Sequence, residues 1–518
     1  MKYPLGRQDF RDIRERGLVY VDKTREVCAV ADLRTYLFLA RPRRFGKSLT
    51  VATLAELHSG DRELFKGLWA YDHWDFPARH SSVVWLRFAS SGFADAGLEV
   101  ALHNMIDGNA DRLGIASLPP RAAKPATRFR ALLEGAAAVS PSGKAVLLVD
   151  EYDKPITHHI EGGAGGTLDE GIHETLRVLK AFYGVLKDAD RYLELAFITG
   201  VSAFSKVSLF SDLNNLINLT LNRQVATLVG LTEEEITDYF EEDIAATGVS
   251  RETLRQWYNG YRFAANAERV YNPWSVLTFL FEGYLGNYWY ETGTPSWLIR
   301  YMLTQPTLPR LEAIEEHKVA LVSFDVRAFR TIPLLFQSGY LTIDGFTPVD
   351  EMYTLRFPNR EVEEAFGVSL LDAMVDKPDA RMYQRVTHAG RALRAGRLED
   401  FFAVLSDLLA SIAYTLYDAK SESAYHVAAH TLLHVADVRS RSEASSARGR
   451  ADTIVETSDY VYCFEFKVGR PPGEAIAQIR ERSYLDAFRA DPRECIAVGV
   501  SFDAEKRNVG EWVAESIK

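Results

Sequence analysis

The sequence predicts an α/β protein whose first third forms a mostly parallel sheet. Short apolar runs alternate there with helix-like stretches, and a polar turn follows each run. Alternation of this kind is typical of a parallel sheet covered by helices on both faces. The predicted strands are residues 35–40, 82–88, 145–149 and 194–199.

Length and composition narrow the class of protein. A chain of 518 residues is too long for one hydrophobic core, so two to four domains are expected. A hydrophobic content of 47% and a charged content of 25% are ordinary for a soluble globular protein. The net charge of −11 argues against a chain coated in nucleic acid. It leaves room for a local basic groove that binds DNA, because phosphate contacts depend on local Lys and Arg.

Cysteines and apolar runs indicate the compartment. The three cysteines are far apart and form no CxxC pair, so neither a disulfide framework nor a zinc knuckle is indicated. The N-terminal segment is polar, and no apolar run reaches the length of a membrane span. We therefore expect a cytoplasmic protein without membrane contact.

The character of the chain changes after the predicted sheet. Thr232 and Glu235 have the spacing of a capping box, and helical patterns then dominate to about residue 330. Residues 333–343 predict a helix, a turn at Gly339 and a strand. A small winged-helix module ends in this order, and other small α+β units have the same pattern.

The C-terminal part predicts helices followed by strands. Residues 376–416 are largely helical, and the Ser/Arg/Ala-rich run 439–450 is expected to be a flexible loop. A hairpin over 451–467, a helix over 473–489 and a strand over 494–501 complete the pattern.

A phosphate site is predicted where a strand leads through a loop into a helix, between Leu37 and Ser48. Such a site needs N–H groups converging at a helix N-terminus, a lysine for the outer phosphates and a hydroxyl for Mg²⁺. Lys47 and Ser48 fit the last two roles. Arg41 stands where the first glycine of the loop is usual, and Pro42 follows it. The alternative is a chance Gly-Lys-Ser in a basic turn.

Two acids at the end of a later strand favour the phosphate site. In P-loop ATPases the first such acid, here Asp150, holds Mg²⁺ through water, and the second, here Glu151, polarises the attacking water. Another strand ends at Thr199, whose hydroxyl either senses the γ-phosphate or simply ends the strand. The loop also carries Arg43 and Arg44, which are placed to contact phosphate or another domain. The predicted nucleotide-binding residues are Arg43, Arg44, Phe45, Gly46, Lys47, Ser48, Asp150 and Thr199.

A second group of chemistry-bearing residues lies in the predicted hairpin. If residues 458–459 form a two-residue turn, Asp452 lies directly opposite Glu465. Cross-strand partners share a face, and residues two apart on one strand also share it. Lys467 therefore joins the two carboxylates.

Two carboxylates and an ammonium on one face suit metal-assisted phosphodiester hydrolysis. Asp452 and Glu465 would bind Mg²⁺ or Mn²⁺ together with the backbone carbonyl of Phe466. Lys467 would orient or deprotonate the attacking water. The alternative is a solvated hairpin face with a cross-strand ion pair, although opposed acids repel unless a cation lies between them.

Three further residues are secondary candidates for this site. Glu422 would supply another acid, Gln478 would contact metal-bound water or phosphate, and Tyr484 would pack or contact substrate. For each of them a purely structural role is the stronger alternative.

With these residues in view, nearly the whole chain resembles a bacterial family that joins an AAA-ATPase-like domain to a C-terminal nuclease of the PD-(D/E)XK superfamily. In the N-terminal part, the matching stretches are 3–10, 20–24, 41–48, 149–155, 198–202, 204–207, 257–263 and 335–341. In the C-terminal part they are 357–359, 425–426, 449–452, 464–467 and 478–479.

The resemblance implies the complete fold class. It is α/β, with a P-loop NTPase parallel sheet, a helical or winged-helix middle segment, and a C-terminal α/β restriction-endonuclease-like domain. The implied divisions are an AAA-ATPase-like domain at 1–230, a helical lid and winged-helix-like segment at 231–345, a connector at 346–375, and the nuclease domain at 376–518.

The resemblance also bears on individual residues. It implies that Arg41 in place of glycine is normal for the family. Nucleases of the superfamily often carry Gln and Tyr four apart on the helix after the hairpin. Here Arg482 stands four after Gln478 and Tyr484 two later, so the role of Tyr484 stays open.

Three functions remain in competition. The first is an ATP-binding, ATP-regulated, Mg²⁺-dependent endonuclease that cleaves DNA, with defence against foreign or mobile DNA suggested by analogy alone. The second is a nucleotide-dependent switch or scaffold with a silent nuclease-like domain. The third is an ATPase or motor with a DNA-anchoring domain. A homo-oligomer is also compatible with the sequence.

Overall fold

The computed structural model describes residues 2–162, 171–203, 209–210, 213, 215–293, 296–303, 314–322, 330–375, 381–412, 422–436, 439–446 and 449–517. The chain divides into two compact units. The N-terminal unit comprises Met1–Trp297 and Ala313–Glu361, and the C-terminal unit comprises Leu298–Glu312 and Val362–Lys518. The four divisions expected from the sequence stay a prediction.

The N-terminal unit contains the expected parallel sheet. Its five strands have the order β2-β3-β4-β1-β5, and all neighbours are parallel. The strands are β1 (Tyr36–Ala40), β2 (Ser82–Arg87), β3 (Ala145–Asp150), β4 (Leu193–Gly200) and β5 (Leu216–Asn218). Strands β1 and β3 are buried along their whole length, as continuous apolar strands of a covered parallel sheet should be.

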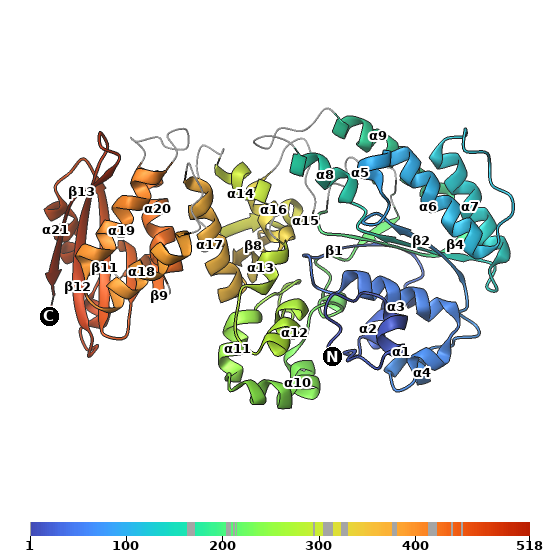
Figure 1. The fold of residues 1–518 in the computed structure, drawn as a ribbon, viewed down its shortest axis with the longest axis horizontal. Coiled ribbons are helices and arrows are strands. Elements are labelled where there is room, and N and C mark those ends of the chain that lie inside the picture. Colours follow the sequence, from blue (N-terminus) through green and yellow to red (C-terminus); the bar gives the residue numbers. More distant parts are fainter. Residues whose placement is uncertain are drawn as a thin grey trace. The chain divides into compact units, whose positions relative to one another are not determined.

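Helices cover both faces of this sheet (Figure 1). One side carries α1 (Phe10–Glu15), α2 (Thr24–Asp32), α3 (Lys47–Ser59) and α4 (Trp69–His73). The other carries α5 (Phe93–Ala96), α6 (Leu98–Leu113), α7 (Pro125–Val139), α8 (Lys154–Gly162) and α9 (Gly171–Gly184).

A helical segment follows the sheet. It comprises α10 (Glu233–Thr247), α11 (Arg251–Tyr258), α12 (Pro273–Glu282) and α13 (Tyr288–Gly293). The predicted capping box is confirmed: the Thr232 hydroxyl accepts from the Glu235 N–H, and the Glu235 carboxylate accepts from the Thr232 N–H. Such reciprocal bonds satisfy two N–H groups at the start of α10.

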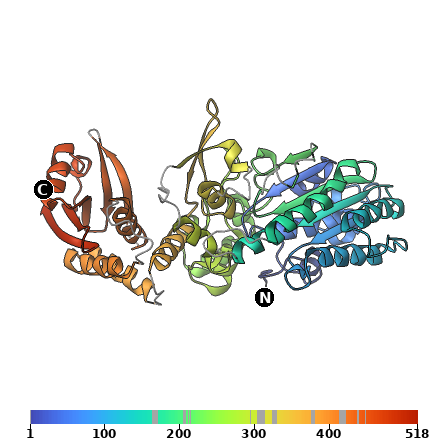
Figure 2. The same ribbon diagram turned by 90° about the horizontal axis from the view of Figure 1, so that it is seen from above.

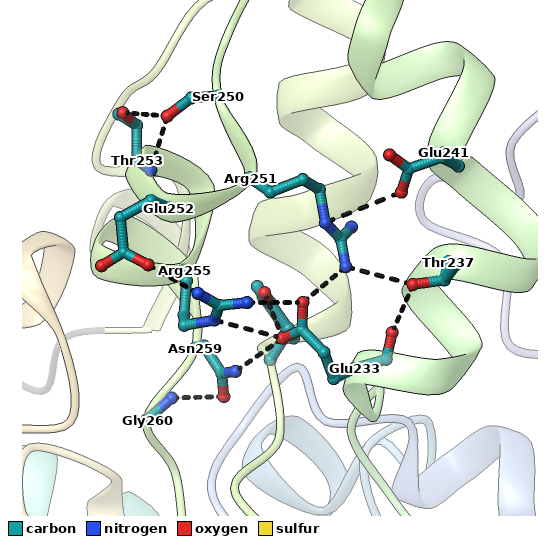
Figure 3. Close-up of polar contacts among 11 residues, drawn as sticks. Glu233, Thr237, Glu241, Ser250, Arg251, Glu252, Thr253, Arg255, Asn259 and Gly260 are labelled. Atoms are coloured by element: carbon teal, nitrogen blue, oxygen red, sulfur yellow. Dashed lines mark hydrogen bonds and ion pairs between the residues drawn. The ribbon is translucent and has the colours of Figure 1, made fainter.

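Glu233 joins α10 to α11 (Figure 3). Its carboxylate accepts from Arg251 at 2.6 Å, from Arg255 at 3.1 Å and from the Tyr271 hydroxyl at 2.7 Å. Burial raises the pKa of Glu233, but bonds from Arg255 and Tyr271 more than offset this, so the pKa lies below its ordinary value. The cluster fixes the first turn of α10 against α11.

The predicted helix, turn and strand near Gly339 are also present. Helix α16 (Thr331–Ser338) ends at Gly339, which has φ +94°, and strand β7 begins three residues later. Strands β6 (Ile314–His317), β8 (Met352–Arg356) and β7 (Thr342–Thr347) form a small antiparallel sheet in that order. Figure 2 shows the β7–β8 hairpin, in dark yellow, projecting beyond the helices of its segment. Helix α15 (Lys318–Val322) also lies in this unit, whereas α14 (Ser296–Leu303) belongs from Leu298 onward to the C-terminal unit.

The C-terminal unit is built on a mixed sheet of order β13-β12-β11-β10-β9. Its strands are β9 (Arg439–Ser446), β10 (Gly449–Glu456), β11 (Tyr460–Val468), β12 (Glu494–Asp503) and β13 (Asn508–Ser516). Only the β11–β12 pair is parallel. The helices are α17 (Arg360–Met374), α18 (Met382–Arg394), α19 (Leu398–Ser411), α20 (Glu422–Val435) and α21 (Pro472–Arg482). Helix α21 lies on one side of the sheet and α18–α20 lie on the other (Figure 1).

Two sequence interpretations in this unit are wrong. The run 439–450, expected to be a loop, supplies strand β9 and the start of β10, because pairing with the edge of the sheet overrides weak local β-propensity. The helix expected to reach residue 489 ends at Arg482, where Ser483 adopts a left-handed φ of +54°.

One structural observation bears on membranes. Among the described residues, none of the helices combines the length and the hydrophobicity that crossing a bilayer requires.

Candidate functional site

The predicted phosphate loop joins β1 to α3. Arg44 and Gly46 adopt positive φ angles of +68° and +93°, and Gly46 is the N-cap of α3. Left-handed residues in so short a loop turn backbone N–H groups toward one side, as in the nests that bind anions. The dipole of α3 adds partial positive charge at the same place.

Lys47 is bonded within the loop itself. Its Nζ donates to the carbonyl oxygens of Arg41 at 2.9 Å and Pro42 at 2.7 Å. Burial lowers the pKa of Lys47 to about 8, partly offset by the charges of Glu151 and Asp150. A phosphate entering the loop would compete with these two carbonyls for the ammonium group.

Asp150 lies at the end of β3 and is 8% exposed. Burial raises its pKa, and a hydrogen bond from the Ser48 hydroxyl partly offsets the rise. Its Oδ1 is buried and has no hydrogen-bond partner among the described residues. A carboxylate oxygen left in this way beside a hydroxyl fits Mg²⁺, which prefers oxygen ligands. Ser48 and Asp150 would hold the ion.

Glu151 and Thr199 differ in how they suit catalytic roles. Glu151 has a φ of +54°, a sparsely populated conformation that is often retained where function requires it. The Thr199 hydroxyl is fully buried and donates to the Leu39 carbonyl at 2.9 Å. That bond favours the structural alternative for Thr199, and its role toward the γ-phosphate stays a prediction.

Arg41 replaces the usual first glycine with a buried cation. Its guanidinium donates to the carbonyl oxygens of Ala40 at 2.9 Å and Thr220 at 2.7 Å, and it lies 4.4 Å from the Phe263 ring centre. Burial lowers the pKa of Arg41 to about 9. The side chain thus ties the start of the loop to the chain after β5, which explains structurally how the loop begins without glycine.

The next three loop residues face the helical segment. The carbonyl of Arg43 accepts from the Trp289 indole N–H at 3.0 Å. The Arg44 guanidinium lies 4.4 Å from the Trp274 ring centre. Phe45 is 1% exposed and packs edge-on against Tyr261. For Phe45, therefore, only the backbone remains to contact a nucleotide.

Sequence reasoning assigned no role to Asp153. This residue is 2% exposed, and its carboxylate accepts from the backbone N–H groups of Val201 at 3.0 Å and Ser202 at 2.8 Å. Burial raises the pKa of Asp153 to about 6. It fixes the end of β4 beside the acids that follow β3. An acid two residues after Glu151 was the available signal.

The hairpin has the predicted register. The Thr457 N–H donates to the Tyr460 carbonyl at 2.8 Å, which leaves residues 458–459 as a two-residue turn. The ladder pairs Thr453 with Phe464, so Asp452 falls opposite Glu465. Asp452 also accepts from the Phe466 N–H at 2.8 Å.

Glu465 is the deepest group of this cluster. It is 1% exposed, and its Oε1 accepts from Lys467 Nζ at 2.9 Å. Burial and then the charge of Asp452 raise the pKa of Glu465, although the bond from Lys467 lowers it. A carboxylate this buried is not part of a solvated face, so that alternative interpretation of the hairpin does not hold.

The cluster offers carboxylate oxygens of the kind that a divalent metal ion prefers as ligands. Glu465 Oε2 is buried and lacks a hydrogen-bond partner among the described residues, and Asp452 supplies a second carboxylate. The described part of the chain contains no group of three His, Cys, Asp or Glu residues that could hold a metal ion. Two protein carboxylates with water ligands still suit Mg²⁺, which keeps several waters. The carbonyl of Phe466 stays a predicted third ligand.

The three secondary candidates have different surroundings in the structure. Tyr484 is 4% exposed and belongs to the apolar cluster with Ile476 and Cys463, so it packs in the core between α21 and the sheet. Gln478 donates to the Tyr484 hydroxyl at 3.5 Å. Glu422 is the first residue of α20, and its side chain lies outside what the structure describes.

Comparison with known proteins gives the family. Residues 4–210 match the model described as "Predicted AAA-ATPase", and residues 420–512 match the "PD-(D/E)XK nuclease superfamily". The chain is 34% identical over 527 aligned residues to the "Uncharacterized protein in vnfD 5'region" of Azotobacter chroococcum mcd 1. That similarity covers 100% of this chain and 99% of the relative.

The chain belongs to the family that fuses an AAA-ATPase-like domain to a PD-(D/E)XK nuclease domain. The phosphate loop and the acids after β3 fall inside the first match, and the hairpin carboxylates fall inside the second. No solved structure matches the chain. The fold therefore has an ATPase-like parallel sheet and a nuclease-like mixed sheet.

Proposed function

We propose that this protein is an ATP-regulated, metal-dependent endonuclease that cleaves DNA. The observation that carries the proposal is the buried Glu465 carboxylate, which lies opposite Asp452, binds Lys467 and has one oxygen without a partner among the described residues. Such a site is expensive to keep in a protein core unless a cation completes it. The nuclease-superfamily match covers all three residues.

The hairpin residues divide the chemical work. Asp452 and Glu465 would hold Mg²⁺ or Mn²⁺, and the metal would supply an activated water and offset charge on the phosphate. Lys467, whose side chain is 16% exposed, reaches both the carboxylate and solvent. Its ammonium would orient the attacking water and stabilise negative charge that develops on the phosphate oxygens.

The proposed regulation comes from the phosphate loop. Lys47 and the N–H groups at the start of α3 would bind the ATP phosphates, with Mg²⁺ held by Ser48 and Asp150. Glu151 would orient the water that attacks the γ-phosphate. The AAA-ATPase-like match and the Ser48–Asp150 hydrogen bond support this assignment. A role in defence rests on analogy alone and stays a prediction.

A plasmid-nicking assay tests the proposed function. The full chain is incubated with supercoiled DNA and Mg²⁺ or Mn²⁺, with and without ATP. We expect metal-dependent nicking whose rate changes with ATP and which is lost in Asp452→Ala. Asp459→Ala is the matched control, because it removes an exposed carboxylate from the turn of the same hairpin.

Two other results would assign a different function. ATP binding without cleavage under either metal would indicate the switch or scaffold with a silent nuclease-like domain. DNA-stimulated ATP hydrolysis that is lost in Glu151→Ala, again without nicks, would indicate an ATPase with a DNA-anchoring domain.

A further inference from the structure

Several motifs of this chain belong to neither candidate site. They lie in 257–263, 335–341 and 357–359, beyond the parallel sheet and before the hairpin. In the structure, residues from all three gather around the phosphate loop or around the start of α17. This gathering calls for an explanation, because packing alone does not require contact with a ligand-binding loop.

The helical segment and the turn after α16 contact the phosphate loop at successive positions. Beside the Trp289–Arg43 hydrogen bond, Gly339 lies against Pro42 so closely that an added Cβ would stand 2.7 Å from the Pro42 Cβ. Gly339 also has φ +94°, so both space and backbone favour glycine there. Residues much later in the sequence therefore pack against the phosphate loop.

Helix α16 also contacts the chain just after β4. The Gln337 side chain, 3% exposed, accepts from the Ala203 N–H at 2.8 Å and donates to the Leu321 carbonyl at 3.0 Å. Strand β4 lies between the phosphate-loop strand β1 and the acid-bearing strand β3. Contacts from Trp289, Gly339 and Gln337 thus reach the loop after β1 and the chain just after β4.

Trp289 connects these contacts to helix α17. Its backbone N–H donates to Glu361 Oε1 at 2.6 Å, and the Ser275 hydroxyl donates to Glu361 Oε2 at 2.7 Å. Trp289 and Glu361 are each fully buried. Glu361 is the second residue of α17, and the following residues of that helix, from Val362, belong to the C-terminal unit.

A tight junction surrounds Glu361. Gly260 has φ +116°, and a Cβ there would lie 1.9 Å from the Pro358 carbonyl oxygen. The Arg360 guanidinium lies 4.9 Å from the Trp257 ring centre. These contacts hold the start of α17 and the residues before it against the helical segment, so we expect a shift of Trp289 to be passed on to them.

Nucleotide binding would disturb this path at its first link. Lys47 is bonded to the carbonyls of Arg41 and Pro42, the two residues that precede Arg43. When phosphates take up the ammonium group, both carbonyls lose their donor, and the loop must readjust next to the Trp289 contact. Packed interiors transmit such shifts because they are close-packed.

We propose that Trp289 and Glu361 are positioning residues that convey nucleotide occupancy of the phosphate loop to helix α17. The inference rests on the proposed nucleotide binding and specifies its route of regulation. Arg43, Trp289 and Glu361 form the route: the loop carbonyl, the indole with its backbone N–H, and the carboxylate at the start of α17.

Hydrogen–deuterium exchange of the full chain tests this route without measuring cleavage. Uptake is followed in peptides covering residues 361–374, with and without a non-hydrolysable ATP analogue and Mg²⁺. We expect the analogue to change the uptake of α17 in the wild type. Trp289→Phe replaces the indole with a smaller phenyl ring and removes the indole N–H, so it should bind the analogue and lose the α17 response.

Matched variants separate the route from general stability. Tyr258→Phe also removes hydrogen bonds in the helical segment, from the hydroxyl to the Gly286 carbonyl at 3.1 Å and from the Gly286 N–H to the hydroxyl at 3.0 Å, and should keep the response. Glu361→Gln retains an acceptor for the Trp289 N–H and should also keep it, whereas Glu361→Ala should lose it. If Glu361→Ala fails to fold, Trp289→Phe still decides the question.

The outcomes distinguish this inference from the proposed function. A wild type that binds the analogue with no change in α17, or a Trp289→Phe variant with the full change, overturns the inference alone. An intact α17 response in a protein that never cleaves DNA overturns the nuclease proposal alone. Failure to bind the analogue, measured by calorimetry, overturns the inference and the proposed regulation together.

Discussion

The phosphate loop and the nuclease hairpin balance their charges in opposite ways. In the loop, the Lys47 ammonium is held by two backbone carbonyls, and Ser48 donates to Asp150. In the hairpin, the carboxylates of Asp452 and Glu465 lie opposite each other, and the Lys467 ammonium donates to Glu465. The loop thus has internal partners for its cation, and the hairpin has an excess of negative charge.

This difference predicts two kinds of ligand binding. A nucleotide must exchange partners at the loop, because its phosphates replace the Arg41 and Pro42 carbonyls around Lys47. A divalent cation only adds to the hairpin, because Glu465 Oε2 has no partner to lose among the described residues. The exchange of Lys47 partners links nucleotide binding to the conformation of the loop. The addition of a metal ion to the hairpin mainly relieves the repulsion between its carboxylates.

The largest expected effect concerns the hairpin. Glu465→Ala and Lys467→Ala should each reduce Mg²⁺-dependent nicking about 10²- to 10⁴-fold, the range for removing a group that assists proton transfer or positions the attacking water. Nicking rates under saturating metal measure the loss. If both variants cut DNA at the wild-type rate, the hairpin is not the catalytic site. The comparison between a nucleotide site and a metal site would then be wrong.

The next effect concerns the loop. Lys47→Ala should weaken ATP binding about ten- to hundredfold, because hydrogen bonds to charged groups are worth about 1.5–3 kcal/mol. Titration calorimetry gives the affinity. Lys144→Ala, which removes an exposed lysine of the same unit, is the control and should bind ATP as the wild type does. Equal affinities for all three proteins would place the nucleotide elsewhere.

A smaller effect distinguishes a structural role of the Thr199 hydroxyl from a role in sensing the γ-phosphate. Thr199→Val removes the hydrogen bond to the Leu39 carbonyl and should lower the free energy of unfolding by about 1 kcal/mol. We expect ATP affinity and turnover to be kept. A variant with unchanged stability and impaired turnover would instead assign the hydroxyl to the γ-phosphate.

The smallest effect is the pH dependence of stability at Glu465. Its raised pKa means that the folded protein holds the proton more tightly than the unfolded chain. Between the ordinary value of 4.5 and the raised one, the folded state binds more protons, so stability falls as pH rises through that window. Without metal, Glu465→Gln should therefore have a higher melting temperature than the wild type at neutral pH.

The same variant also reports on the metal. The advantage of Glu465→Gln should vanish below pH 4.5, and Mg²⁺ should raise the melting temperature of the wild type more than that of the variant. Identical melting curves at every pH, with and without Mg²⁺, would show that Glu465 does not bear the uncompensated charge on which the comparison depends.

Local pattern predicted the hairpin better than it predicted its surroundings. The two-residue turn and the alternation of side chains fixed Asp452 opposite Glu465, because strand geometry has a strict period of two. The neighbouring run 439–450 lacks the usual strand residues, so its local pattern predicts a loop. Its pairing with β10 depends on a sheet edge that only the folded chain provides.

The phosphate loop shows the same limit. Gly46, Lys47 and Ser48 are readable from sequence because a strand, a loop and a helix start follow one another there. The burial of Arg41 and the use of the Thr199 hydroxyl by Leu39 are not readable, because both depend on neighbouring strands that lie far away in the chain. The contacts of Asp153 with Val201 and Ser202 are not readable for the same reason.

The sequence by itself determined strands β1–β4, the hairpin register and the residues at the head of α3, since each follows from spacing within about twenty residues. Only the tertiary structure decided that Lys47 is held by loop carbonyls, that Glu465 is buried, and that Trp289 joins Arg43 to Glu361. Those contacts join residues up to 246 positions apart. They arise from packing of separate elements, which local periodicity does not specify.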